Sequence, residues 1–150
     1  MPNQLKLQYT VEFKTSRKRA FDYIKEVKNR KHFMTIVDQT KITHPVKGEN
    51  LKGLRFVEVT HFLGFDMKLN YEIVDYKDGH TITTACNDGP FYPVMGITLN
   101  ERSPKTCTGE VNVSLQTDVL KLIPSFLIKP TVEAIIKPIL KKMVAAVEES

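Results

Sequence analysis

Between Ile36 and Gln116 the chain divides into six strand-length segments separated by short turn-forming runs, and this pattern constrains the fold most. The runs contain Gly, Pro, Asp or Asn, which favour the backbone conformations of tight turns. Because consecutive strands joined by short turns pair antiparallel, we expect an antiparallel sheet. The expected strands are Ile36 to Thr43, Leu54 to Leu63, Asp66 to Tyr76, His80 to Asn87, Val94 to Glu101 and Thr106 to Gln116.

A further strand and two helical segments come before this region. Apolar and polar residues alternate from Leu5 to Phe13, which predicts a strand with one buried face. Thr15 or Ser16 then offers a helix N-cap, and apolar residues follow at three- and four-residue spacings from Ala20 to Val27. A second short helical turn is expected from Arg30 to Met34.

The C-terminal part of the chain changes to helical periodicity and predicts a long amphipathic helix. Pro130 suits the first turn of this helix, whereas Pro138 lacks an amide hydrogen and is expected to bend it. The apolar segment from Leu120 to Ile128 is interpreted as an irregular or helical lead-in. The apolar face consists of Val132, Ile136, Ile139, Met143 and Val147.

Length and composition indicate one globular domain spanning residues 1–150. A chain of 150 residues can bury a sufficient core without disulfides or structural metals. Its 41% hydrophobic and 26% charged residues are typical of globular proteins and argue against disorder. Because no signal peptide and no membrane-spanning apolar run is recognisable, we expect a soluble, cytoplasmic protein.

The two cysteines and four histidines give no sign of a metal site. Cys86 and Cys107 lie far apart, and neither belongs to a CxxC motif or a Cys/His cluster, so we expect no metal and no cofactor. Cys86 lies on the expected strand His80 to Asn87 and Cys107 on the expected strand Thr106 to Gln116. If these two strands lie on either side of the strand Val94 to Glu101, the two cysteines are about two strand spacings, or roughly 9 to 10 Å, apart. A disulfide requires Cα atoms closer than about 7 Å, so free thiols are predicted.

Basic residues concentrate between Lys14 and Lys31 in a chain of net charge +5. The preferred interpretation is a solvated helix face, and the alternative is a surface that attracts an anionic partner. No aromatic interleaving or nucleic-acid motif accompanies the charges, so no nucleic-acid partner is expected. The basic residues are Lys14, Arg17, Lys18, Arg19, Lys25, Lys28, Arg30 and Lys31.

Turn geometry sorts the strand residues into two faces. A two- or four-residue loop near Gly64 pairs even positions of the preceding strand with odd positions of the next, which gathers the apolar side chains on one face. Glu58 is an exception on this face, beside or diagonal to Tyr71, and a buried carboxylate needs a partner. It either forms a structural hydrogen bond to Tyr71, or reaches water, or takes part in ligand binding or catalysis.

The apolar turn formed by Phe62, Leu63, Gly64 and Phe65 also requires an explanation, because hairpin turns are normally polar. One interpretation is that the turn forms a cavity mouth or a transient membrane contact. The other is ordinary packing beneath a neighbouring loop.

The order of elements, together with the segments VEFKTSRKRAFDYIKEVKN, LKGLRF, GITLNER and TCTGEVNVSLQTD, resembles the START-like (SRPBCC) superfamily. The resemblance is greatest to its polyketide cyclase/dehydrase-like and coenzyme-Q-binding branches. It implies an α+β helix-grip fold, in which a seven-stranded curved antiparallel sheet wraps around a long C-terminal helix and two short helices follow strand one. It also implies a ligand cavity between sheet and helix, of the kind that takes lipids, polyketides, sterols or quinones. The superfamily has no universal catalytic residue.

Three functions follow as hypotheses. The leading one is binding, and also transport, of a hydrophobic small molecule in the cavity. The second is a cyclase or dehydratase that uses Glu58 as general base and Tyr71 as hydrogen-bond donor. The third is a protein-interaction module, with a chaperone or ribosome partner, that uses the basic N-terminal helix. The expected ligand-lining residues are Tyr9, Phe56, Glu58, Tyr71, Thr84, Ile97 and Met143.

Overall fold

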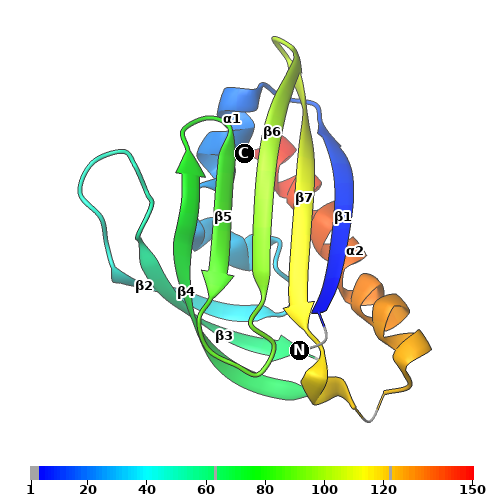
Figure 1. Cartoon of the computed structure of the whole chain (residues 1–150). Coiled ribbons are helices and arrows are strands. Elements are labelled where there is room, and N and C mark those ends of the chain that lie inside the picture. Colours follow the sequence, from blue (N-terminus) through cyan, green and yellow to red (C-terminus); the bar gives the residue numbers. More distant parts are fainter. Residues whose placement is uncertain (1–3, 63, 122) are drawn as a thin grey trace.

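The computed structural model describes residues 4–62, 64–121 and 123–150 and contains an antiparallel sheet that curves against one long helix (Figure 1). This arrangement confirms the α+β helix-grip fold expected from the sequence. In chain order the elements are β1 (Gln4–Phe13), α1 (Arg17–Ile24), η1 (Val27–His32), β2 (Val37–His44), β3 (Arg55–Phe62), β4 (Phe65–Lys77), β5 (Thr81–Cys86), β6 (Val94–Ser103), β7 (Thr106–Gln116), η2 (Asp118–Leu120) and α2 (Ser125–Glu149).

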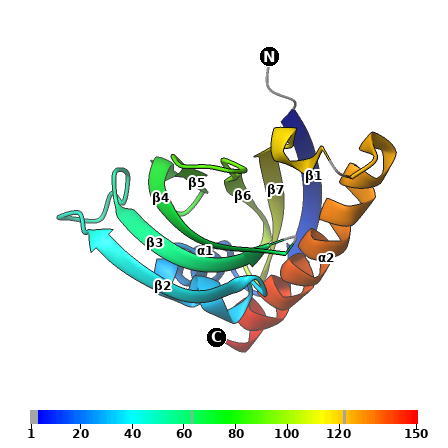
Figure 2. The same cartoon turned by 90° about the horizontal axis from the view of Figure 1, so that it is seen from below.

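The seven strands are ordered β1-β7-β6-β5-β4-β3-β2, and every neighbouring pair is antiparallel. All connections from β2 to β7 join neighbours, whereas β1 pairs with the last strand. Seen from below, the sheet is strongly curved and α2 lies along β1 (Figure 2). The concave face of the sheet is therefore turned toward the helices.

The first helix is shorter than the sequence pattern suggests. Ser16 is the N-cap, and its side chain accepts a hydrogen bond from the amide of Arg19 at 3.2 Å. Because Glu26 has an extended backbone conformation, the helix does not continue to Val27, which instead begins the 3-10 helix η1. The predicted second helical turn is thus present but begins three residues before Arg30.

The hairpin registers confirm the predicted faces. Phe56 pairs with Tyr71 across β3 and β4, so even positions face odd positions as expected. The next hairpin differs, because Lys77 pairs with Thr81 across a three-residue loop and not across a two-residue turn at Asp78 and Gly79. The longer loop alone would shift the pairing of the two strands by one residue. An irregularity between Ile73 and Asp75 cancels this shift, so that Ile73 pairs with Thr84 as expected.

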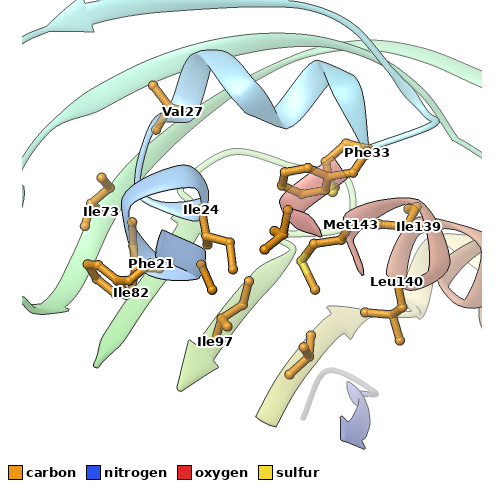
Figure 3. Packing of buried hydrophobic residues seen from close by; sticks show 14 of the residues in the cluster. Phe21, Ile24, Val27, Phe33, Ile73, Ile82, Ile97, Ile139, Leu140 and Met143 are labelled. Carbon is orange, nitrogen blue, oxygen red and sulfur yellow. The ribbon is translucent and has the colours of Figure 1, made fainter. Parts of the chain in front are cut away.

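The core lies between the concave face of the sheet and the three helical segments α1, η1 and α2. Phe21 and Ile24 of α1 are buried, as are Phe33 after η1 and Met143 of α2. Figure 3 shows these side chains turned toward a common interior above the strands. The packing of the helices on the sheet thus buries apolar surface, which stabilises the fold.

The long helix α2 begins at Ser125 and includes part of the expected lead-in. Pro130 therefore lies in its second turn and not in the first, and Pro138 lies in its interior. Within the described ranges, no helix combines the length and the apolar character needed to cross a membrane.

Both cysteines are buried free thiols, as predicted, and β5 and β7 do flank β6. The predicted distance between them was wrong, because they lie at opposite ends of these strands. Cys107 pairs with Glu101, whereas Cys86 follows Ala85, which pairs with Val94 at the other end of β6. Burial and a hydrogen bond to Asp88 raise the pKa of Cys86 to about 12, so this thiol stays protonated and unreactive at neutral pH.

Candidate functional site

A cavity of about 70 Å³ lies between the concave face of the sheet and α2. Its wall is almost entirely apolar, and its polar members are Arg30, Thr60, Tyr71 and Thr84. The apolar members are Met34, Ile36, Phe62, Met67, Leu69, Phe91, Pro93, Val94, Met95, Val113, Leu115, Ile135, Ile136, Ile139 and Leu140.

The helix-grip geometry explains why these side chains converge. Inward-facing positions of β3 to β7 form the floor, because alternate residues of a strand point to the same face. Ile135, Ile136, Ile139 and Leu140 form the opposite wall, since the spacing places them on one side of α2. The cavity therefore faces the middle of α2, and the end of the helix around Met143 packs into solid core.

The cavity is small for a ligand site. Pockets that hold drug-sized ligands have volumes of about 300–1,000 Å³. Larger hollows of about 570 and 640 Å³ lie on the outer surface, but charged and polar residues such as Lys6, Asp75, Arg17 and Glu49 line them. The interior cavity is therefore the candidate site for an apolar molecule, and a larger ligand has to widen it.

Glu58 is fully buried and its partner is Arg30, not Tyr71 or water as we expected. Arg30 Nε donates to Glu58 Oε2 at 2.7 Å, and Nη2 donates to Oε1 at 3.0 Å. Thr40 on the neighbouring strand donates its hydroxyl to the same Oε2 at 2.9 Å. The carboxylate is thus held by a bidentate ion pair and a hydroxyl, which compensates for its loss of water.

The Arg30 guanidinium also covers two stacked aromatic rings. Its central carbon lies 5.3 Å from the ring centroid of Phe56 and 5.4 Å from that of Tyr71, which is within cation–π range. Burial alone would lower the pKa of Arg30, but the charge and hydrogen bonds of Glu58 outweigh it and raise that pKa. Arg30 therefore remains charged inside the protein.

Two of the seven residues predicted to contact a ligand, Tyr71 and Thr84, line the cavity. Burial raises the pKa of the Tyr71 phenol, so its hydroxyl is a donor at any physiological pH. The Thr84 hydroxyl donates to the Met95 carbonyl at 3.5 Å. Glu58 is not among the lining residues, so the general base and the donor assumed for the enzyme hypothesis do not share the cavity.

The other predicted residues have structural surroundings outside the cavity. Phe56 is fully buried and stacks on Tyr71, and Met143 lies in the core. Ile97 lines a separate void of about 20 Å³. Tyr9 donates a hydrogen bond to Glu133 at 3.1 Å and so joins β1 to α2.

Arg30 is the functional-site residue that sequence reasoning missed, because it was counted within a solvated basic face. A 3-10 helix has three residues per turn, and Val27, Arg30 and Phe33 follow at that spacing. All three are buried. The three-residue spacing with two apolar neighbours is the signal that could have placed Arg30 inside.

The remaining basic residues of the segment from Lys14 to Lys31 differ in their partners. Lys18 and Lys25 each pair with Asp22, at 2.9 and 3.2 Å, whereas Arg30 is buried. The exposed part of the basic patch is therefore smaller than the sequence suggests.

Among the residues described, no three His, Cys, Asp or Glu side chains come close enough to hold a metal ion.

The apolar hairpin turn between β3 and β4 contributes to the cavity. Phe62 is buried, lines the cavity and packs edge-on against Phe91 with centroids 4.9 Å apart. Phe65 contacts the same ring at 5.6 Å but is 42% exposed. Leu63, the other large member of the predicted turn, lies outside the described residues.

Comparisons with known proteins give matches only at the level of structure. No protein-family model and no curated protein matches the sequence. A START superfamily protein from Mycobacterium smegmatis superposes with a TM-score of 0.81 over 96% of this chain and 97% of that chain, at 12% identity. Zhui aromatase/cyclase from Streptomyces sp. R1128 gives a TM-score of 0.78 over 97% and 94%, at 10% identity. Ara h 8.0201 gives 0.69 over 99% and 100%, also at 10% identity.

The structural matches cover nearly the whole chain. At these identities they establish the fold, and the activity has to be argued from the site. This chain has the START-like helix-grip fold.

Proposed function

We propose that the protein binds a hydrophobic small molecule in the cavity between the sheet and α2. The observation that carries the proposal is an interior cavity between the sheet and α2 whose wall is almost wholly apolar. Burial of ligand hydrocarbon stabilises a complex by about 25 cal/mol per Å². The lining residues Tyr71 and Thr84 retain their predicted role in this proposal.

A bound ligand has to widen the cavity, and the composition of the wall supports this. Met34, Met67 and Met95 line the cavity, and methionine side chains repack readily because three of their bonds rotate. Ile135 and Ile136 on α2 are only half-buried. We infer that repacking of the methionines and a shift of α2 relative to β4 enlarge the cavity when a ligand enters.

Native mass spectrometry of the purified protein, followed by solvent extraction, tests the proposal. We expect a mass increment above the polypeptide that disappears on denaturation, and an extracted compound soluble in organic solvent. Protein expressed in two unrelated hosts serves as a control for compounds specific to one host. Absence of any increment in both hosts, and after incubation with a lipid extract, would contradict the proposal.

We also propose that the end of the molecule carrying the β3–β4 turn contacts an anionic membrane surface transiently. Exposed apolar side chains gather there, with Phe126 76% exposed and Leu127 41% exposed at the start of α2, and Phe65 at the turn. Both segments lie at the same end of the molecule in Figure 1. Exposed Lys121 and Lys129 flank the α2 residues, and basic side chains next to apolar ones favour anionic lipid.

Replacement of Phe126 and Leu127 by Ser should weaken binding to vesicles of phosphatidylcholine and phosphatidylglycerol by several-fold, while the melting temperature stays unchanged. The reason is that both side chains are exposed and contribute little to the core. Vesicle co-sedimentation measures the effect. Val74→Ser, at an exposed apolar residue on β4, is the matched control and should bind as the wild type does. Equal vesicle binding by all three proteins would remove the proposed membrane contact.

A further inference from the structure

The hydroxyl of Thr60 differs from the other buried polar groups of this protein. Thr60 is 2% exposed, and it lies on the inner face of β3 between Val37 of β2 and Met67 of β4. Within the described part of the chain, its Oγ1 is the one fully buried side-chain nitrogen or oxygen that lacks a hydrogen-bond partner. A buried hydroxyl without a partner costs free energy, so its retention calls for an explanation.

Packing alone does not account for a threonine at this position. Valine has the same shape and would avoid the unpaired hydroxyl, and the neighbouring inward positions on β3, apart from Glu58, carry phenylalanine. Nearby polar groups are not partners, since Glu58 is held by Arg30 and Thr40. No protein group of the described residues satisfies Thr60.

The location of Thr60 indicates where a partner can come from. Thr60 lines the apolar cavity, but its Oγ1 atom is itself fully buried. A molecule that widens the cavity, as proposed above, would come within reach of this hydroxyl. The Thr84 hydroxyl, on the same wall, already donates to a backbone carbonyl. Thr60 and Tyr71 are therefore the described lining residues whose hydroxyls remain for an oxygen atom of a ligand, and of the two only the Thr60 hydroxyl is fully buried without a partner.

We infer that the ligand carries a hydroxyl or carbonyl oxygen on a hydrophobic skeleton, and that Thr60 hydrogen-bonds this oxygen inside the cavity. The inference rests on the proposed binding function and adds the chemical class of the ligand. A pure hydrocarbon would leave the Thr60 hydroxyl unpaired, whereas an oxygenated compound pairs it and is preferred. The site thus selects polarity at one point of an otherwise apolar molecule.

The test compares two probes that differ by one hydroxyl, naphthalene and 2-naphthol, on the wild type and on Thr60→Val. The wild type should bind 2-naphthol about tenfold more tightly than naphthalene, because only 2-naphthol supplies the missing hydrogen bond. In Thr60→Val the preference should reverse, because the naphthol hydroxyl then loses its partner on leaving water. Ligand-free Thr60→Val should melt at a higher temperature than the wild type. Thr83→Val, the same substitution on the outer face of β5, should keep the wild-type preference.

The possible outcomes separate the two proposals. If both probes bind and Thr60→Val leaves the wild-type preference unchanged, the role of Thr60 is wrong while the binding function stands. If neither probe binds the wild type, the binding function fails and the inference fails with it. A lower melting temperature of Thr60→Val would contradict the unpaired state of the hydroxyl in the free protein.

Discussion

Replacement of Arg30 by Met should lower the free energy of unfolding by about 3–5 kcal/mol, because it leaves the Glu58 carboxylate buried without its counter-ion. For a chain of this size that loss corresponds to a fall of roughly 6–20 °C in melting temperature. Glu58→Gln should also be strongly destabilising, since the Arg30 charge then lacks a partner. Urea denaturation of each variant measures the change.

The double variant Arg30→Met with Glu58→Gln completes a thermodynamic cycle. We expect it to be more stable than the sum of the single effects by about 2 kcal/mol or more, because no uncompensated charge remains. Arg55→Met is the matched control, since Arg55 and Glu72 form a similar pair at 2.8 Å with 57% of the Arg55 side chain exposed. It should cost less than about 1 kcal/mol. Additive effects of the Arg30 and Glu58 substitutions would show that the buried pair is not coupled.

The burial of Glu58 could be predicted from the sequence, but its partner could not. Its burial on an apolar face followed from strand alternation alone, and the structure confirms it. Its partner Arg30 lies 28 residues away in a short 3-10 helix, and no local pattern specifies how that helix packs on β3. Alternation predicts which face a residue occupies, whereas the contact across the interior depends on tertiary packing.

The β4–β5 hairpin was predicted correctly in part through two compensating errors. The loop is one residue longer than the two-residue turn expected at Asp78 and Gly79, and the irregularity near Val74 shifts the register back by one. Ile73 is an apolar residue on the inner face of β4, and its side chain is buried. The register of the two strands therefore follows the burial of this side chain and not the length of the loop. Hydrophobic alternation therefore predicted the inner face more reliably than turn chemistry predicted the loop.

The position of the cavity could not be predicted, because sequence patterns do not distinguish a lining residue from a core residue. Met143 and Ile139 share the apolar face of α2, yet only Ile139 borders the cavity. The two residues are one helical turn apart. Whether each borders empty space or packed core depends on the volume of the side chains opposite, which come from five strands. Volume is a property of the packed structure.

Ile139→Phe should fill the cavity and reduce the affinity for an apolar ligand at least tenfold, which is about 1.4 kcal/mol. The larger side chain extends into space that is already empty, so the stability should change by less than about 1 kcal/mol. Leu99→Phe is the stability control, because Leu99 is fully buried in core that does not border the cavity. Overpacking at that position should cost about 1–3 kcal/mol. An equal loss of stability in both variants would mean that no usable space adjoins Ile139.

The most direct test of an apolar binding cavity is a fluorescence titration with N-phenyl-1-naphthylamine, an apolar fluorophore, on the wild type, Ile139→Phe and Val74→Phe. Val74→Phe adds the same aromatic ring on the exposed outer side of β4 and serves as the control for surface binding. We predict saturable binding of one molecule to the wild type and to Val74→Phe, and at least tenfold weaker binding to Ile139→Phe. Equal affinity in all three proteins, or no saturable binding to the wild type, would contradict the proposal that the cavity between the sheet and α2 is a ligand-binding site.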